Sequence, residues 1–234
     1  MTKKYNGAVF DFYDTLCHVE EETFVKGRRI VAEKVSVPFQ KFYATWKKMG
    51  RKNITGKLYS TSDRMMAVLE ELNVSPSKKE IHEYAEICDS YFLRATKPYS
   101  DALETITELS KRGYELYILS NASSNAERII RKFNHLLSQF RKIYFSYKHG
   151  LAKPDERFFK LLINSEKIDA EKFFYIGDGN DRELDVAKSF GFTTVKVKHP
   201  VMASYRFEES TRWDHEIDNL KNLFSEVIED WGSN

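Results

Sequence analysis

Residues that could do chemistry stand where the apolar segments of this chain end. Asp11 follows the apolar run AVF (8–10) and opens the string DFYDTL (11–16). A carboxylate at the end of a buried parallel strand lies in the crevice where α/β folds bind ligands. A carboxylate that attacks an electrophile also needs a cation beside it to hold the developing charge. Asp11 is therefore a candidate nucleophile that requires partners from elsewhere in the chain.

Three later segments offer such partners. The run LYIL (116–119) leads into Ser120 and Asn121, and Lys153 opens the string KPD (153–155). Asp178 and Glu183 belong to the string GDGNDRE (177–183). Because the carboxyl ends of parallel strands share one edge of a sheet, we expect these groups to meet in one crevice.

Two carboxylates, Asp11 and Asp178, would repel each other there unless a metal ion or Lys153 neutralised them. Oxygen ligands, only a few of them from protein, suit Mg²⁺, which keeps some of its waters. The pattern therefore indicates a magnesium site that leaves room for a phosphoryl oxygen.

The elements that must position these residues alternate along the chain. Apolar runs predict buried strands at 8–12, 116–119, 142–145, 173–176 and 194–197. Apolar residues at helical spacing predict helices at 101–112, 125–133, 155–163 and 183–190. This alternation predicts right-handed βαβ units and a doubly wound parallel sheet, an α/β fold of Rossmann type.

About eighty residues separate the first two predicted core strands, and they carry helical patterns at 20–35, 39–49, 62–72 and 78–93. The predicted organisation is a catalytic core of residues 1–17 and 97–234 and an all-helical cap of residues 18–96. A cap in this position would lie over the crevice, where it could exclude water and select substrate. Its aromatic residues Phe39, Phe42, Tyr43 and Trp46 could line a pocket or form the core of the cap.

Composition excludes several classes of protein. The net charge is +2, with basic and acidic residues interleaved, which argues against nucleic acid as a partner. The two cysteines form no framework or metal motif, and neither a signal peptide nor a membrane-spanning run is found. The sequence predicts a cytoplasmic protein with a small-molecule substrate, and it leaves the oligomeric state open.

The four motifs, in this order, resemble those of the haloacid dehalogenase (HAD) superfamily of aspartate-nucleophile hydrolases. The resembling strings are DFYDTL (11–16), LSN (119–121), KPD (153–155) and IGD (176–178) with Glu183. The resemblance covers the whole predicted core, and the predicted helical cap falls where the family carries its smaller domain. It implies a Rossmann-like HAD core and a hydrolase activity.

The resemblance also implies roles for individual residues. Asp11 would be the covalent nucleophile, Ser120 a hydrogen-bond donor to the transferred group, and Lys153 the group that neutralises charge. The implied Mg²⁺ ligands are Asp11, the backbone carbonyl of Tyr13 and Asp178, with Glu183 supporting the metal or Lys153.

Thr15 and Asn121 would lie on the substrate side of the site, where they orient backbone rather than react. Asp14, Asn180 and Asp181 are expected to be turn residues or to support the residues in direct contact with substrate.

Tyr13 departs from the phosphatase pattern, which places an aspartate at this position as general acid and base. An unperturbed phenol has a pKa near ~10 and is a poor proton shuttle at neutral pH. Asp14 is not expected to substitute, because the next residue of an extended chain points to the opposite face. The dehalogenase branch of the superfamily resembles this chain here: it has the same tyrosine, the same LSN string and an asparagine at the position of Asn180.

Three other positions argue against dehalogenation. Asp178 stands where metal-free dehalogenases carry serine, and Phe159 stands where they carry tyrosine. Their halide-binding arginine has only Trp46-Lys47 as a loose counterpart. We therefore favour a Mg²⁺-dependent phosphatase that acts on a small phosphorylated metabolite. The alternatives are a metal-free 2-haloacid dehalogenase and a phosphoryl-binding module of low turnover.

Overall fold

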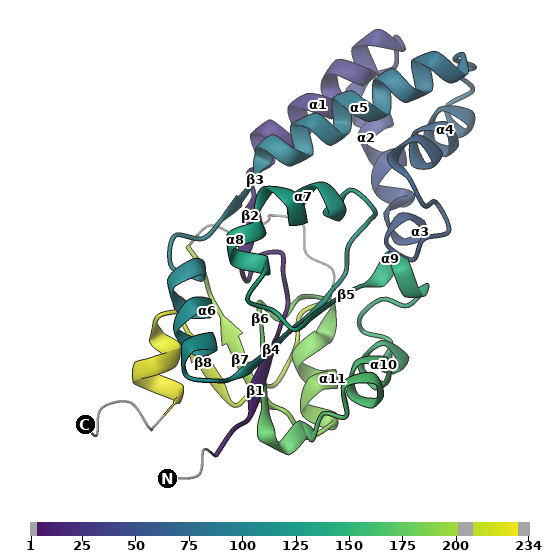
Figure 1. Ribbon diagram of the computed structural model, residues 1–234. Helices are drawn as coiled ribbons and strands as arrows, with labels where there is room; N and C mark the ends of the chain where they lie inside the picture. Colours follow the sequence, from purple (N-terminus) through teal and green to yellow (C-terminus); the bar gives the residue numbers. More distant parts are fainter. Residues whose placement is uncertain (1–3, 201–207, 229–234) are drawn as a thin grey trace.

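The structure is a computed structural model that describes residues 4–200 and 208–228, and an α/β core with a helical cap makes up this part of the chain (Figure 1). The core strands are β1 (Gly7–Phe10), β4 (Glu115–Ser120), β5 (Lys142–Phe145), β6 (Phe173–Gly177), β7 (Thr193–Val197) and β8 (His215–Ile217). They form one sheet in the order β5-β4-β1-β6-β7-β8, with all neighbours parallel. The predicted doubly wound parallel sheet is confirmed.

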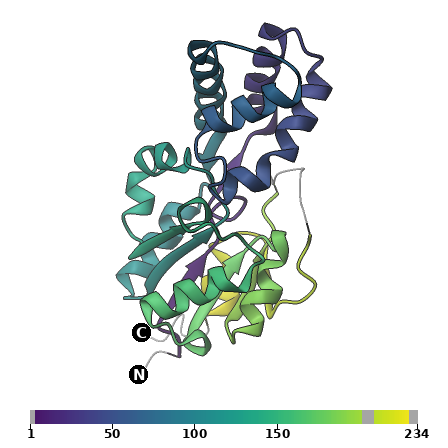
Figure 2. The ribbon, with the colours of Figure 1, turned by 90° about the vertical axis from the view of Figure 1, so that its right-hand side faces the viewer.

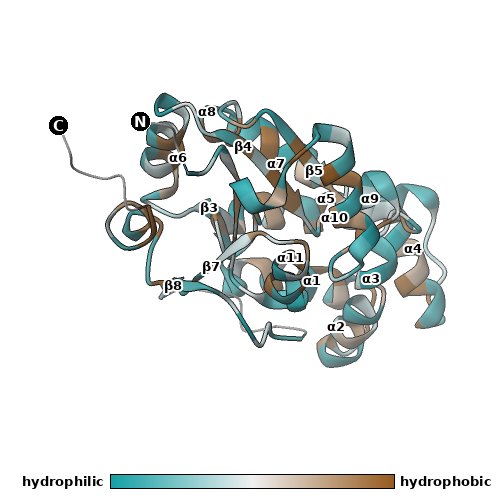
Figure 3. Cartoon of the chain, turned by 90° about the horizontal axis from the view of Figure 1, so that it is seen from below, coloured by the Kyte–Doolittle hydropathy of each residue, from teal (hydrophilic) through white to brown (hydrophobic). Residues whose placement is uncertain are grey.

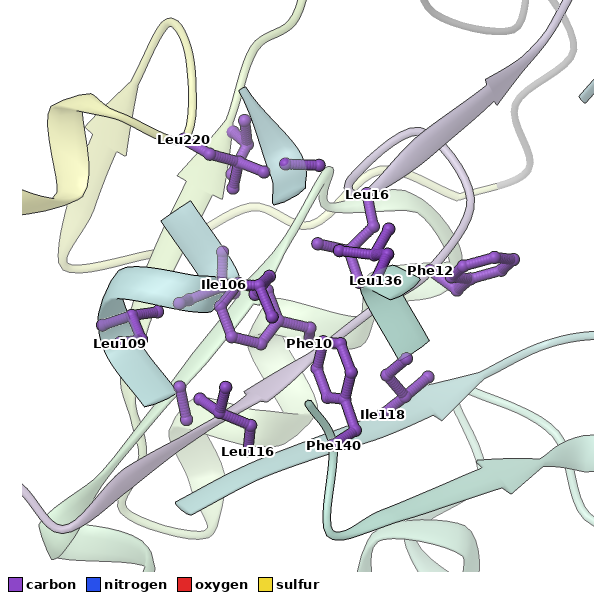
Figure 4. Packing of buried hydrophobic residues seen from close by; sticks show 14 of the residues in the cluster. Phe10, Phe12, Leu16, Ile106, Leu109, Leu116, Ile118, Leu136, Phe140 and Leu220 are labelled. Atoms are coloured by element: carbon purple, nitrogen blue, oxygen red, sulfur yellow. The ribbon is translucent and has the colours of Figure 1, made fainter. Parts of the chain in front are cut away.

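Helices cover both faces of the sheet, as Figure 2 shows, because successive side chains of a strand point to opposite sides. In β1, Phe10 packs in one apolar cluster and Val9 in the other. The Phe10 side receives α6 (Ala102–Lys111), α7 (Ala126–Lys132) and α8 (Asn134–Leu137). The Val9 side receives α10 (Glu156–Glu166) and α11 (Glu183–Ser189). Figure 4 shows Phe10 between Phe140 and Ile106, and the rings of Phe10 and Phe140 meet edge to face.

The cap consists of α1 (Glu21–Lys34), α2 (Phe39–Lys48), α3 (Gly50–Ile54), α4 (Thr61–Glu71) and α5 (Lys78–Ala95). It has its own apolar cluster, in which Phe42, Trp46 and Met65 are buried. Capping boxes at Ser60 and Ser77 begin α4 and α5, because each side chain accepts a backbone N–H that the first turn leaves unpaired. Along the helices in Figure 3, hydrophilic and hydrophobic residues alternate, as expected of helices that bury one face.

An antiparallel ribbon of β2 (Cys17–Val19) and β3 (Thr96–Pro98) joins the cap to the core. The segment 18–96 was expected to be wholly helical, and this is corrected at both of its ends. There the chain that enters the cap and the chain that leaves it pair with each other as strands. The predicted boundaries at 17/18 and 96/97 fall inside this ribbon, and the division into two domains stays a prediction.

The remaining elements are short. They are α9 (Ser146–His149), the 3-10 turns at Ala170–Lys172 and Asn180–Arg182, and a π-helical turn at Leu223–Val227. The sequence did not predict β8, because His215 and Glu216 interrupt any apolar pattern at this edge strand. Among the described residues, no helix combines the length and the apolar character needed to cross a membrane.

Candidate active site

β1 ends at the edge of the sheet that faces the cap (Figure 1), and Asp11 follows directly after it. Its backbone N–H donates to the carbonyl of Ile176 on β6 at 2.9 Å, so the ladder of the sheet continues to this residue. The side chain is buried, with the residue only 6% exposed. The position is rigid and leads into a small cavity of about 70 Å³.

Lys153 provides the cation that the sequence required. Its Nζ donates to Oδ1 of Asp11 at 2.6 Å and also contacts Oε2 of Glu183. Burial by itself would lower the pKa of Lys153, yet the two carboxylates raise it well above the usual range. The ammonium is therefore held protonated next to Asp11.

Ser120 ends β4 and is 1% exposed, and its hydroxyl has no hydrogen-bond partner among the described residues. A buried hydroxyl without a partner is costly unless a ligand satisfies it. Asn121 instead positions backbone: its Oδ1 accepts from Lys153 N at 2.8 Å and its Nδ2 donates to Lys153 O at 3.1 Å. The same amide donates to Oδ2 of Asp181 at 2.7 Å.

The residues at this edge fit a divalent cation. Asp11, Asp178 and Glu183 each offer a carboxylate oxygen, and these oxygens lie within 4.8 Å of one another. Glu183 is already engaged by Lys153, by the Tyr175 hydroxyl at 3.0 Å and by the Gly179 N–H at 3.1 Å. Asp11 and Asp178 are thus the two side chains that could hold Mg²⁺ directly.

The turn after β1 adds a possible third ligand. The Phe12 carbonyl accepts the N–H groups of Leu16 and Cys17, whereas no backbone N–H of the described residues donates to the Tyr13 carbonyl. A carbonyl oxygen in the turn that follows Asp11 suits the oxygen preference of Mg²⁺.

Glu183 packs so closely on the end of β6 that any side chain at position 177 would displace its carboxylate. A Cβ at position 177 would lie 2.1 Å from Oε1 of Glu183. Burial raises the pKa of Glu183, and the Lys153 ammonium opposes this shift. We interpret Glu183 as a residue that positions Lys153 from below the cavity.

Tyr13 is half-buried, with its hydroxyl oxygen enclosed, and its ring meets those of Phe12 and Phe92, with centroids 5.0 and 6.0 Å away. Its hydroxyl has no partner among the described residues. Burial first, and then the nearby Cys17 and Asp11, raise the pKa of Tyr13 well above that of a free phenol. The phenol is therefore an even poorer proton carrier than the sequence indicated.

Asp14 differs from expectation. The backbone is not extended at this residue, because its φ of 56° lies in the left-handed region. Asp14 is buried and lines the same cavity as Asp11 and Tyr13. The argument that it must point to the opposite face is wrong, because that argument requires an extended chain.

Of the remaining predicted residues, two line the cavity and one lies outside it. Asn180 and Asp181 line the cavity with the residues above. Thr15 is fully buried and its hydroxyl has no partner among the described residues, while its carbonyl lies 3.0 Å from Nε2 of His199. Thr15 does not line the cavity around Asp11.

Sequence reasoning missed the role of Tyr175 and left that of Arg51 open. Tyr175 lies in the apolar run of β6, where a tyrosine reads as core, yet its hydroxyl meets Glu183 and lies 3.4 Å from Lys153 Nζ. Arg51 of the cap donates to the carbonyls of Lys153 at 2.9 Å and Ala152 at 3.3 Å. From the sequence, the basic segment that contains Arg51 could meet an anionic substrate or be a solvated polar loop; in the structure Arg51 instead bonds to core backbone.

The site thus consists of buried carboxylates and one lysine at the carboxyl edge of a parallel sheet, next to a helical cap. A family model for haloacid dehalogenase-like hydrolases matches residues 5–191. The chain therefore belongs to this family of hydrolases.

Curated relatives fall into two activities. The chain is 28% identical to the glyceraldehyde 3-phosphate phosphatase of Methanocaldococcus jannaschii over 130 residues, which are 54% of this chain and 55% of the relative. It thus spans about half the length of the curated phosphatases it matches. It is 25% identical to the (S)-2-haloacid dehalogenase of Pseudomonas sp. strain YL over 215 residues, 89% of each chain.

Solved structures share the fold. The L-2-haloacid dehalogenase from Xanthobacter autotrophicus with covalently bound chloropropionic acid superposes with a TM-score of 0.63 at 16% identity, covering 94% of this chain and 96% of that one. A HAD family enzyme from Bacteroides thetaiotaomicron in complex with magnesium and inorganic phosphate gives 0.61 at 18% identity, covering 89% and 97%.

Proposed function

We propose that this hydrolase is a Mg²⁺-dependent phosphatase that acts on a small phosphorylated metabolite, with Asp11 as nucleophile. The observation that carries the proposal is Asp178, a carboxylate only 2% exposed whose oxygen lies within 4.8 Å of one from Asp11. A buried carboxylate next to another is costly unless a cation neutralises it.

The charges of the cluster support a divalent cation. Asp11, Asp178 and Glu183 contribute three carboxylates. Lys153 is the only basic residue among those that line this cavity in the described part of the chain. One ammonium leaves an excess of negative charge, which Mg²⁺ would balance before a phosphate dianion could enter. When bound, Mg²⁺ would supply positive charge opposite the phosphoryl oxygens.

The chain's own residues would then act in two steps. Asp11 Oδ attacks phosphorus and the P–O bond to the alcohol breaks, with the electron pair leaving on the alcohol oxygen. Water then attacks phosphorus, releases inorganic phosphate and restores the Asp11 carboxylate. Ser120 donates its unpartnered hydroxyl to a phosphoryl oxygen, and Lys153 holds the attacking carboxylate in place.

The leaving alcohol needs a proton, and Tyr13 is a poor donor because the pKa of its phenol is raised. We therefore expect aryl phosphates, whose leaving groups need little protonation, to react faster than alkyl phosphates. Asp14 is a second carboxyl in the same cavity and the candidate proton carrier in place of Tyr13.

A second candidate is hydrolytic dehalogenation of a 2-haloacid. Tyr13 and similarity along most of the chain to haloacid dehalogenases favour it. Two features oppose it: Asp178 in the cluster, and Phe159, which is buried against Tyr175 and carries no hydroxyl. A third candidate, a phosphoryl-binding protein of low turnover, follows from Tyr13 alone. A cytoplasmic location stays a prediction from the sequence.

The deciding experiment compares a panel of phosphate esters and 2-haloacids, each with Mg²⁺ and with a chelator, on wild type, Asp11→Asn and Asp178→Ser. We expect phosphate release that requires Mg²⁺ and is lost in both variants. Halide release in chelator that survives Asp178→Ser but not Asp11→Asn would instead establish dehalogenation. Binding of Mg²⁺ and phosphate without turnover of any ester would favour the third candidate.

A further inference from the structure

A second and larger cavity, of about 300 Å³, lies between the cap and the core. Tyr13 and Asn121 line both this cavity and the small one around Asp11, so the two adjoin. Phe24, Trp46 and Phe92 are among the side chains that make its wall largely apolar. A substrate whose reacting group lies at Asp11 would extend the rest of its structure into this space.

Two guanidinium groups interrupt the apolar wall. Arg28 of α1 is only 2% exposed; its Nη1 donates to the carbonyls of Phe24 at 2.9 Å and Cys88 at 3.3 Å. Arg64 of α4 donates from Nη2 to the Trp46 carbonyl at 2.6 Å and from Nη1 to Oδ1 of Asn53 at 3.3 Å. In both arginines the buried Nε has no partner among the described residues.

The same two groups share an aromatic ring. The guanidinium carbons of Arg28 and Arg64 lie 5.2 and 4.2 Å from the centroid of the Trp46 ring. Trp46 thus contacts both cations and also lines the cavity. Its indole is a built-in reporter of what binds between them.

Neither guanidinium forms an ion pair with a carboxylate of the described residues. The half-buried Asp89 of this region accepts from Thr61 at 2.6 Å and lies 3.8 Å from Arg128, and its charge opposes the lowering of the Arg28 pKa. Burial lowers the pKa of Arg28, and burial followed by repulsion from Arg28 lowers that of Arg64 to about 9. Two adjacent cations in an apolar wall are costly unless an anion joins them.

Charged groups of both signs complete the surroundings. Glu21 and Lys47 also line the cavity, but both side chains belong to exposed residues. These two opposite charges lie at the solvent side of the cavity. The charges in its buried part are those of Arg28 and Arg64, so this part is positive.

We propose that Arg28 and Arg64 bind a second anionic group of the substrate, a carboxylate or a phosphate, at the end remote from the scissile phosphate. The substrate class is then a phosphate monoester with an apolar middle and an anionic far end. Planar guanidinium groups carry five N–H donors each and are suited to such oxyanions. The scissile end of this assignment rests on the proposed function, whereas the anion site does not.

The kinetic test uses ω-carboxyalkyl phosphates of increasing chain length, each paired with its ω-carboxamide, which matches it in size and leaving group. A series of ω-phosphonoalkyl phosphates distinguishes a phosphate-like far group from a carboxylate. We expect wild type to prefer the charged member at one chain length by about tenfold or more in kcat/KM. Arg64→Met should abolish this preference, because kcat/KM for the charged member should fall by about tenfold more than kcat/KM for the carboxamide.

Matched variants separate recognition from folding. Arg28→Lys keeps the charge but not the planar fork, so it should lose part of the preference. Arg29→Met, an exposed neighbour that stacks on Phe39 outside the cavity, should retain it fully. Equal kcat/KM for charged and neutral members at every length, or an equal loss for both in Arg64→Met, would overturn the proposal.

A binding experiment separates this inference from the proposed function. Tryptophan fluorescence of Asp11→Asn is titrated with α,ω-dicarboxylates, α,ω-bisphosphonates and monoacids of equal length. Dianion binding that Arg64→Met abolishes would support the anion site even if no phosphate ester turned over. Turnover of phosphate esters without charge preference, and without dianion binding, would reject the anion site and leave the phosphatase proposal intact.

Discussion

Tyr175 donates its hydroxyl to Oε2 of Glu183 at 3.0 Å, and the same oxygen atom of Glu183 contacts the Lys153 ammonium. The Tyr175 hydroxyl also lies 3.4 Å from Lys153 Nζ. The side chains of Tyr175, Glu183 and Lys153, all buried, therefore contact one another, and Lys153 in turn contacts Asp11. Phe159, which packs on the Tyr175 ring at 5.5 Å, contributes shape but no hydroxyl.

Tyr175→Phe tests this relationship, because it removes the hydroxyl and keeps the ring on Phe159. We expect a loss of about 1 kcal/mol in the free energy of unfolding, the net contribution of one hydrogen bond, and a several-fold lower kcat with little change in KM. Urea unfolding and steady-state kinetics measure both. Tyr117→Phe is the matched control, since that hydroxyl meets Glu115 away from the cavity. Equal kcat losses in the two variants would contradict a positioning role.

Lys153→Met leaves Asp11 and Glu183 buried without their ammonium. We expect the free energy of unfolding to fall by about 3–5 kcal/mol at neutral pH, as for other broken buried pairs. Lys160→Met, which removes an exposed lysine, should change stability little.

The pH dependence of this variant has a defined sign. Burial raises the pKa of Glu183, and loss of the ammonium removes the effect that opposes this rise. Between the unfolded and the folded pKa the folded state then binds more protons, so stability falls as pH rises above about 4.5. Urea unfolding at pH 5 and pH 8 should show the larger deficit at pH 8. A deficit independent of pH would contradict the assignment.

In wild type the raised pKa of Lys153 has the corresponding consequence at high pH. A lysine whose folded pKa is raised contributes stability that is complete below the unfolded pKa of about 10.4. This contribution is lost as pH rises through the higher folded pKa.

Arg51→Ala tests how the cap is held over the site. The variant removes the donors to the carbonyls of Lys153 and Ala152, so the cap loses two hydrogen bonds to the segment that carries Lys153. We expect KM to rise by about threefold to tenfold, the cost of one or two hydrogen bonds. Lys52→Ala, at the next exposed position, is the control. A KM unchanged in Arg51→Ala would show that other contacts hold the cap.

Tyr13→Asp restores the carboxyl that phosphatases of the family carry at this position. If phosphoryl transfer is the reaction, turnover of alkyl phosphates should rise, by up to about 100-fold for a well-placed general acid. Tyr13→Phe removes only a hydroxyl that has no partner among the described residues, so it should leave activity unchanged and stability equal or slightly higher. Unchanged turnover in Tyr13→Asp would show that the tyrosine is not a missing acid.

Asp14→Asn completes this comparison. If Asp14 carries the proton in place of Tyr13, alkyl phosphate turnover should fall by at least about tenfold. Aryl phosphate turnover should fall less, because its leaving group needs less protonation. An equal effect on both substrates would assign Asp14 to the backbone turn alone.

The sequence by itself determined the parallel sheet and the edge at which Asp11, Ser120, Lys153 and Asp178 meet. Apolar runs specify buried strands, and the handedness of βαβ crossovers brings the carboxyl ends of parallel strands together. Few strand orders satisfy these constraints. The order of the motifs along the chain was therefore sufficient to predict that these four residues share one edge of the sheet.

Tertiary structure decided which side chains share the cavities. The left-handed φ at Asp14 brings it to the cavity of Asp11, and the fold places the Tyr175 hydroxyl against Glu183. It also gathers Arg28 and Arg64, from different cap helices, around Trp46. Such contacts depend on backbone turns and on packing between distant segments, and periodicity along one strand or helix carries no information about either.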